Sequence, residues 1–306
     1  MHVAVVGAGS LGRIYGVHLA AQSVPVTFVV RPSRLGEANA FVIRDVARGG
    51  RLRTVAHPSL SAEVPADATV ILLAVRVDQI DAALEQTLRA APPVPLVSLT
   101  PLLPLSQRRV DALVDGRCRP ALPSVAGTFD DDGVVRYRVL PRAKTLVESE
   151  KGRDPILVEL VEAFDNSGIP AKLAPGVSRR NPATTIAFFP LSLGLSQAGS
   201  ATALVADREL LRLSLAACAE SRELSRRIGP VEPALAMTRF AGTRSFRALV
   251  AVARRFAPGA LTYLEQHFGH KLEAQHRVIA AEIAELAREL GVPMPAFGEL
   301  TARTRR

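Results

Sequence analysis

The feature that most constrains the fold is a glycine-rich turn close to the start of the chain. The run Val3 to Val6 is short and apolar, which is typical of a buried parallel strand. Gly7, Gly9 and Gly12 follow in the spacing G-x-G-x-x-G, and a helix is expected from about Ser10 to Ala21. In such a unit Gly7 allows the tight turn, Gly9 lets a pyrophosphate approach the backbone, and Gly12 lets the helix pack on the sheet. The order of strand, turn and helix therefore predicts a dinucleotide-binding unit.

The start of this helix supplies the predicted phosphate contacts. Its free N–H groups and the positive end of its dipole favour an anion. The predicted cofactor-binding residues of the turn are Gly7, Gly9, Ser10, Leu11 and Gly12.

A second strand is expected over Val24 to Val30, and Arg31 follows it. An acidic residue at this place would bind the ribose 2′-hydroxyl of NAD, whereas an arginine favours the 2′-phosphate of NADP. Arg31, Ser33 and Arg34 offer two guanidinium groups and a hydroxyl, which suit a phosphate. We therefore predict NADP(H) as the cofactor, with Arg31 and Arg34 among its contacts. The plain alternative is an α/β turn with a pair of surface arginines.

A third strand is expected over Thr69 to Ala74, and Arg76 lies just beyond its carboxyl end. Ligands of open α/β sheets bind outside these ends, so Arg76 is a further candidate for the cofactor or substrate. The alternative is an ordinary arginine at the start of a helix. Two short runs, 41–44 and 51–55, predict a small antiparallel pair inserted before this strand.

Near the middle of the chain the predicted secondary structure changes from alternating strands and helices to helices alone. A helix over about 78–90, a strand over 94–99, a helix to about 114 and a helix over 155–166 continue the α/β pattern. Asp130 to Gly133 reads as a solvated turn, and no metal site is predicted. Strands are expected to stop near 170–181, and only helices follow, at roughly 183–199, 207–228, 241–256, 260–268, 272–290 and 297–304. This order predicts a Rossmann domain at 1–175 and an all-helical domain at 176–306.

Composition excludes several classes of protein. The chain has 306 residues, of which 48% are hydrophobic, so it is not largely disordered. No apolar run is long enough to predict a membrane span or a signal peptide, and the two cysteines, Cys118 and Cys218, match no metal or redox spacing. We therefore expect a cytoplasmic protein.

The formal net charge is +9, which suits an anionic cofactor and substrate. Nucleic acid is the competing explanation. The basic residues are scattered, only 5% of residues are aromatic and tryptophan is absent, so nucleic-acid binding is not expected.

The chain resembles the ketopantoate reductase family, which shares its architecture with 6-phosphogluconate dehydrogenase-like proteins. The segments that carry the resemblance are Gly7-Ala8-Gly9-Ser10-Leu11-Gly12, Arg31, Ala74-Val75-Arg76, Gly133-Val134-Val135, Pro190-Leu191-Ser192 and Gly291-Val292-Pro293-Met294-Pro295. The resemblance implies an NADPH-binding first domain, a helical second domain and a small-molecule substrate in the cleft between them. It also implies reduction of a branched 2-oxo acid to its 2-hydroxy acid, and a homodimer formed through the helical domain.

The catalytic residues of the family are poorly matched. Its catalytic helix reads Lys, then Asn four residues later, then Asn-Pro four residues later again. Aligned on Pro190, these positions hold Asn181, Thr185 and Phe189, so the proton-donating lysine is missing. A spacing of four places the three side chains on one face of a helix. Phe189 makes that face more apolar than in the family.

The family's Asn-Gly turn and its late Glu are also poorly matched in this chain. The family's Asn-Gly turn after the fourth strand aligns with Thr100-Pro101-Leu102, and its late substrate-binding Glu falls on Gln275, or on Glu273 with a two-residue shift. Arg180, beside the missing lysine, is a poor general acid but could clamp a carboxylate. The resemblance thus makes Arg180, Thr185, Phe189 and Gln275 candidates for substrate binding.

Replacement proton donors are expected between Tyr263 and His276, a stretch rich in groups that transfer protons. His270 and Glu273 lie three apart, so on a helix the carboxylate would orient the imidazole. The candidate catalytic residues are His270, Lys271, Glu273 and Asn181; the plain alternative is a polar helix surface.

Three hypotheses follow. The first is an NADPH-dependent reductase of a carbonyl or imine in a small, fairly apolar molecule other than ketopantoate, with or without a carboxylate. The second is an enzyme of non-redox chemistry, a cyclisation or isomerisation, that retains nucleotide binding. The third is a nucleotide-sensing or scaffold protein.

Overall fold

The structure is a computed structural model that describes residues 1–36, 39–47, 49–149, 154–231, 242–256, 265 and 272–303. Contacts within the chain divide it into two compact units, Met1–Ser178 and Arg179–Arg306.

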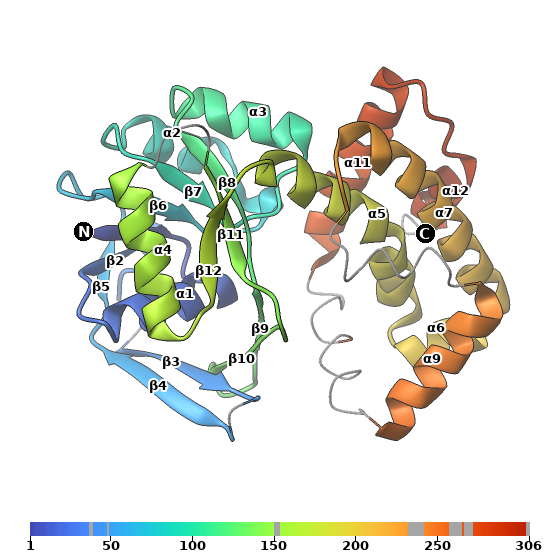
Figure 1. The fold of residues 1–306 in the computed structure, drawn as a ribbon, viewed down its shortest axis with the longest axis horizontal. Coiled ribbons are helices and arrows are strands. Elements are labelled where there is room, and N and C mark those ends of the chain that lie inside the picture. Colours follow the sequence, from blue (N-terminus) through green and yellow to red (C-terminus); the bar gives the residue numbers. More distant parts are fainter. Residues whose placement is uncertain are drawn as a thin grey trace. The chain divides into compact units, whose positions relative to one another are not determined.

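The first unit is built on a mostly parallel sheet. Its eight strands, counted over the described residues, have the order β12-β11-β8-β7-β6-β1-β2-β5 (Figure 1). Their bounds are β1 Val3–Val6, β2 Val26–Val29, β5 Ser59–Ser61, β6 Val70–Leu73, β7 Leu96–Ser98, β8 Cys118–Leu122, β11 Thr145–Glu148 and β12 Ala171–Ala174. All neighbouring strands pair in parallel except β8 and β11. This is the predicted Rossmann-type sheet.

The strands next to the glycine-rich turn lie in the centre of the core. Every residue of β1 and β6 is buried, as their continuous apolar runs predict. The helices of this unit are α1 Ser10–Ala20, α2 Ala82–Arg89, α3 Pro104–Leu113 and α4 Pro155–Ser167, with short 3₁₀ turns η1 Pro32–Arg34 and η2 Val77–Gln79. Helix α1 packs against α4, and α2 against α3 (Figure 1).

A second, smaller sheet packs on α1. Its strands are β3 Ala40–Asp45, β4 Arg51–Ala56, β9 Val125–Phe129 and β10 Val135–Val139, in the order β4-β3-β10-β9. The predicted antiparallel pair of β3 and β4 is confirmed. The parallel pairing of β3 with β10 joins segments about ninety residues apart and was not predicted.

The turn between β9 and β10 is held by one carboxylate. Asp130 accepts hydrogen bonds from the Val134 N–H at 2.9 Å and from the Arg136 guanidinium at 3.1 Å. The predicted solvated turn is confirmed. No cluster of three or more metal-binding side chains occurs within the described ranges.

Two local predictions were wrong, both on where a helix starts. The helix expected from residue 78 begins at Ala82, because the Asp81 carboxylate accepts from the Leu84 N–H at 3.0 Å and caps it there. Strand β12, which pairs with β11, is the last strand of the described residues and ends at Ala174, within the range where strands were expected to stop.

Helix α5, Val177–Ala198, begins six residues earlier than predicted. Pro182 suggested a helix start but lies inside the helix. The buried Glu148 carboxylate accepts hydrogen bonds from the Gly176 and Ser178 N–H groups at 2.8 and 2.6 Å, which fixes the true start.

The second unit contains helices, with no strand among its described residues. The helices are α5 from Arg179 onward, α6 Ala201–Ala206, α7 Arg208–Ile228, α9 Thr243–Phe256, α11 Glu273–Glu289 and α12 Pro295–Arg303. Helix α7 packs against α12 and α6, and α6 also packs against α9. Most of the helix predicted at 260–268 lies outside the described residues. In the described part of the chain, every helix is too short or too polar to cross a bilayer. The predicted fold class, a Rossmann-type domain followed by helices, is confirmed.

Candidate functional site

The glycine-rich turn leaves β1 through a conformation that favours glycine. Gly7 has a φ of +100°, and its N–H donates to the Val29 carbonyl at 2.9 Å. A Cβ on Gly7 would lie 2.6 Å from Cγ1 of Val75. Both the positive φ and the close contact require glycine here.

Gly12 and Gly9 differ in what surrounds them. A Cβ on Gly12 would lie 1.9 Å from the Gly7 carbonyl oxygen, so this glycine is needed for α1 to approach the turn. A Cβ on Gly9 would come near only the Ala74 carbonyl oxygen, at 3.8 Å. Gly9 is exposed and therefore leaves space beside the backbone for a ligand.

The start of α1 has no side-chain cap and no acidic side chain in its first turn. Gly9 is the N-cap and supplies no side-chain hydrogen bond, and the first turn carries no acidic residue. Ser10 and Leu11, the first two residues of α1, are partly exposed. Free N–H groups and an undiminished dipole suit a phosphate at this place.

The sheet topology places the other predicted contacts at the same edge. Strand β1 lies between β2 and β6, and all three are parallel, so the segments after their carboxyl ends are neighbours. These segments begin at Gly7, Val30 and Ala74. The buried Thr100 hydroxyl donates to the Val75 carbonyl at 2.7 Å and steadies the segment that leads to Arg76.

Arg31 and Arg76 have carboxylate partners in this structure. Arg31 pairs with Asp81 at 3.3 Å, and both side chains are exposed. Arg76 donates from Nε and Nη2 to the two oxygens of Asp78, both at 3.0 Å. Arg34 ends η1, and its N–H donates to the Arg31 carbonyl at 2.8 Å.

Arg13 is a residue of this site that the sequence analysis missed. Its Nε donates to the Ala8 carbonyl at 3.0 Å. Its guanidinium carbon lies 4.2 Å from the ring centroid of Phe41 and 4.9 Å from that of Phe129. Burial, and secondly the nearby charge of Arg34, lower the pKa of Arg13. Its position beside the glycine turn was visible in the sequence, but its partners come from β3 and β9.

The helical unit brings together the predicted residues of α5. The Thr185 hydroxyl donates to Oδ1 of Asn181 at 3.4 Å, one turn away. Asn181 and Phe189 are both buried. Arg180 is partly exposed, whereas its neighbour Arg179 donates from Nε to the Ile228 carbonyl at 2.9 Å and is engaged at the end of α7.

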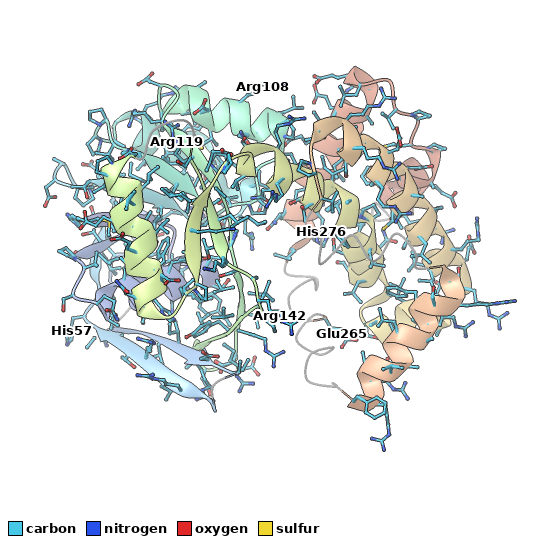
Figure 2. The ribbon with its side chains drawn as sticks, in the orientation of Figure 1. His57, Arg108, Arg119, Arg142, Glu265 and His276 are labelled. Carbon is cyan, nitrogen blue, oxygen red and sulfur yellow. The ribbon has the colours of Figure 1, made fainter. Side chains whose placement is uncertain are left out.

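Phe189 packs among aromatic rings. Its centroid lies 5.6 Å from that of His276, with the rings nearly perpendicular at 81°, and 6.2 Å from that of Phe297. His276, on α11, is only 4% exposed (Figure 2). Its Nδ1 is buried and has no hydrogen-bond partner among the described residues. Burial lowers the pKa of His276, and the charge of Glu273 opposes this more weakly.

The remaining predicted site residues are exposed, partly exposed or outside the described residues. Glu273 forms an exposed ion pair with Arg277 at 3.0 Å, and Gln275 is partly exposed on the same helix. His270 and Lys271 lie outside the described residues.

Both cysteines are buried and free. Burial raises the pKa of Cys118 to about 12 and that of Cys218 to about 11. Thiols that stay protonated at neutral pH are poor nucleophiles and poor metal ligands.

The chain matches known proteins in part of its sequence and in its fold. The family model described as ketopantoate reductase PanE/ApbA matches residues 3–100. No curated protein matches the chain.

Solved structures match over the whole chain at low identity. A PanE/ApbA family ketopantoate reductase from Ralstonia eutropha JMP134 is 19% identical, with a TM-score of 0.72 over 100% of this chain and 97% of that chain. A dimeric ketopantoate reductase from Staphylococcus aureus is 12% identical, with a TM-score of 0.70 over 100% and 98%. D-mandelate dehydrogenase with NADH and anilino(oxo)acetate is 14% identical, with a TM-score of 0.69 over 100% and 97%.

At identities of 12–19%, these solved structures establish the fold of the chain alone. The resemblance identified from the sequence is confirmed: residues 3–100 match the PanE/ApbA ketopantoate reductase family model, and the chain has the fold of the ketopantoate reductases over its full length.

Proposed function

We propose that the protein is an NADPH-dependent reductase of a carbonyl or imine in a small, fairly apolar substrate other than ketopantoate, with or without a carboxylate. The observation that carries the proposal is the glycine-rich turn. Gly9 leaves open space beside an uncapped helix start, within a domain whose family reduces 2-oxo acids.

The residues at the carboxyl edge of the sheet fit a dinucleotide. The N–H groups at the start of α1 would hold the pyrophosphate, and Gly7, Gly9, Ser10, Leu11 and Gly12 would surround it. When bound, the dinucleotide supplies the hydride.

The arginines at this edge would set the cofactor preference. Arg31 and Arg34 would bind the 2′-phosphate, which requires Arg31 to exchange its exposed partner Asp81 for the ligand. Arg76, which pairs with Asp78 in this structure, would contact the cofactor or the substrate beyond the carboxyl end of β6.

The α5 face would contact the substrate. Asn181 can orient a carbonyl through its amide but cannot release a proton near neutral pH. Thr185 and Arg180 would add polar contacts, and Phe189 would add apolar surface. His276, which touches Phe189, would keep a neutral imidazole beside this surface.

Four further residues complete the proposal. Gln275 would bind the substrate from α11, and Glu273 would orient a proton donor. His270 and Lys271 are the proposed donors themselves.

The likeness to D-mandelate dehydrogenase supports an apolar substrate. That protein was solved with NADH and anilino(oxo)acetate, a carboxylate that carries an aromatic ring. Phe189, in place of a family asparagine, would make the α5 face of this chain more apolar and so better suited to such a molecule. Because that structure holds NADH, our preference for NADPH rests on the arginines and not on the fold.

The missing lysine favours a second candidate function. An enzyme that retains nucleotide binding but performs a cyclisation or isomerisation would need no proton donor matched to hydride transfer. We also propose that the protein acts in the cytoplasm as a homodimer, with the dimeric ketopantoate reductase from Staphylococcus aureus as the supporting likeness.

Turnover with both dinucleotides tests the proposal. The purified chain would be mixed with NADPH or NADH and a panel of 2-oxo acids that ranges from pyruvate to aromatic members, and loss of the reduced nicotinamide absorbance followed. We expect oxidation of NADPH with apolar members. Binding without oxidation by any carbonyl or imine would favour the second candidate, and failure to bind either dinucleotide would contradict both.

A further inference from the structure

Arg13 is held in one orientation by groups from four segments of the first unit. Its Nε donates to the Ala8 carbonyl at 3.0 Å, and its Nη1 donates weakly to the Gly133 carbonyl at 3.4 Å. The guanidinium also lies over the rings of Phe41 and Phe129. A guanidinium stacked on aromatic rings keeps its plane fixed and its charge, so it is preorganised to bind an anion.

The place of Arg13 is specific within the glycine turn. Ala8 lies between the first two glycines, so the side chain folds back from the first turn of α1 beside the ligand edge. Arg34, at the end of η1 after β2, carries a second guanidinium, and its charge adds to burial in lowering the pKa of Arg13. No described carboxylate lies within ion-pair distance of Arg13. An anion bound by both guanidinium groups would offset the repulsion that Arg34 exerts on Arg13.

The chemistry of the anion follows from the two ends of a bound dinucleotide. The pyrophosphate is expected at the N–H groups of Ser10 and Leu11, at the start of the helix. The ribose next to the adenine is expected at the end of the second strand, where Arg34 lies. Arg13 lies beside the turn, and the charge of Arg34 at that second position acts on it.

We propose that Arg13 is a cofactor-specificity residue, whose guanidinium acts with that of Arg34 to bind a phosphate monoester on the ribose of a nucleotide held by the glycine turn. The inference rests on the proposed nucleotide binding and adds Arg13 to the residues proposed to bind the 2′-phosphate. Phe41 and Phe129 position Arg13, and their place in the inserted sheet links that sheet to cofactor choice.

Two nucleotides that differ only in this phosphate test the inference. Adenosine 2′,5′-bisphosphate and 5′-AMP would be titrated against the purified full chain by calorimetry, with inorganic phosphate as a third ligand. We expect the wild type to bind the bisphosphate at least tenfold more tightly than 5′-AMP, since a charge-assisted hydrogen bond is worth about tenfold or more. Arg13→Gln should lower this ratio about tenfold and leave the affinity for 5′-AMP within about twofold.

The control is Arg89→Gln, which removes the same charge from an exposed position paired with Glu85 and should leave the ratio unchanged. If Arg13→Gln does not fold, Arg13→Lys keeps the charge and stem but loses the planar fork, and it should lower the ratio by a smaller factor. A ratio unchanged in the Arg13 variant that folds would overturn the inference, as would equal loss of affinity for both nucleotides.

The wild-type titrations separate the two proposals. Tight 5′-AMP binding with no preference for the bisphosphate would overturn only the role of Arg13, whereas no binding of either nucleotide would overturn the proposed function as well. Inorganic phosphate that binds as tightly as the bisphosphate would show a free-phosphate site and contradict the assignment to a ribose phosphate.

Discussion

The rings of Phe189 and His276 meet edge to face, with centroids 5.6 Å apart and planes at 81°. This contact buries an imidazole whose Nδ1 lacks a partner among the described residues, and burial lowers its pKa below the ordinary value of 6.5. The folded protein therefore disfavours the protonated ring.

The depressed pKa of His276 predicts a loss of stability in mild acid. Between pH 6.5 and the lower folded pKa, the unfolded state binds more protons, so the free energy of unfolding falls as the pH is lowered through this window. Urea unfolding at a series of pH values measures this, and His276→Gln should remove part of the slope below pH 6.5. His57→Asn, at an exposed histidine, is the control and should leave the slope intact. An identical slope in His276→Gln and the wild type would contradict the prediction.

Gly9→Val tests the ligand space beside the turn. A Cβ here meets only the Ala74 carbonyl oxygen, at 3.8 Å, and Gly9 has an extended backbone that valine adopts readily. The variant should unfold at a denaturant concentration close to that of the wild type but lose NADPH binding by at least about a hundredfold, a loss of about 2.7 kcal/mol. Fluorescence titration of NADPH gives the affinity. Unchanged NADPH affinity would mean that the pyrophosphate does not lie at this turn.

Gly12→Ala, unlike Gly9→Val, should lower the free energy of unfolding. Its Cβ would lie 1.9 Å from the Gly7 carbonyl oxygen, a backbone atom that cannot move aside cheaply. We expect a loss of about 1–3 kcal/mol or more in the free energy of unfolding. Gly298→Ala, a helical glycine with no atom within 4 Å of the added Cβ, should instead gain up to about 1 kcal/mol. Chemical denaturation of both variants checks the contrast, and a stable Gly12→Ala protein would refute the close approach of α1.

Ketopantoate itself should be a poor substrate. In the alignment on Pro190 that we propose, Asn181 takes the position of the family's proton donor, and positioned general acids contribute about 10²–10⁴-fold to rates. The double variant Asn181→Lys with Thr185→Asn should gain ketopantoate reduction while Phe189 keeps its packing. Steady-state oxidation of NADPH by ketopantoate measures this, with Thr185→Asn alone as the control. Fast turnover of ketopantoate by the wild type, about 1–10³ s⁻¹ as in ordinary enzymes, would contradict the alignment.

The sequence predicts well what local patterns determine. The glycine spacing, the apolar runs of β1 and β6 and the helical periodicity of the second unit each act within a few residues, so the fold class and the phosphate turn were readable. The start of α5 was not, because it depends on Glu148, nearly thirty residues earlier. Strand β12 and the β3–β10 pairing likewise depend on distant partners.

The candidate site likewise has features that local sequence patterns determine and features that depend on distant residues. The structural roles of Gly7 and Gly12 could be predicted because each is set by backbone geometry. The role of Arg13 could not, because Phe41 and Phe129 reach it from β3 and β9. Nor could the burial of His276, which depends on packing against Phe189, 87 positions before it in the sequence.

Transfer of deuterium from the cofactor tests the central claim most directly. NADPH labelled with deuterium at the transferring position of the nicotinamide would be incubated with the protein and an apolar 2-oxo acid, and the product analysed by mass spectrometry. The account predicts one deuterium on the carbon that becomes the alcohol, with one NADPH consumed for each product. A product formed without deuterium and without loss of NADPH would contradict a reductase and indicate non-redox chemistry on this fold.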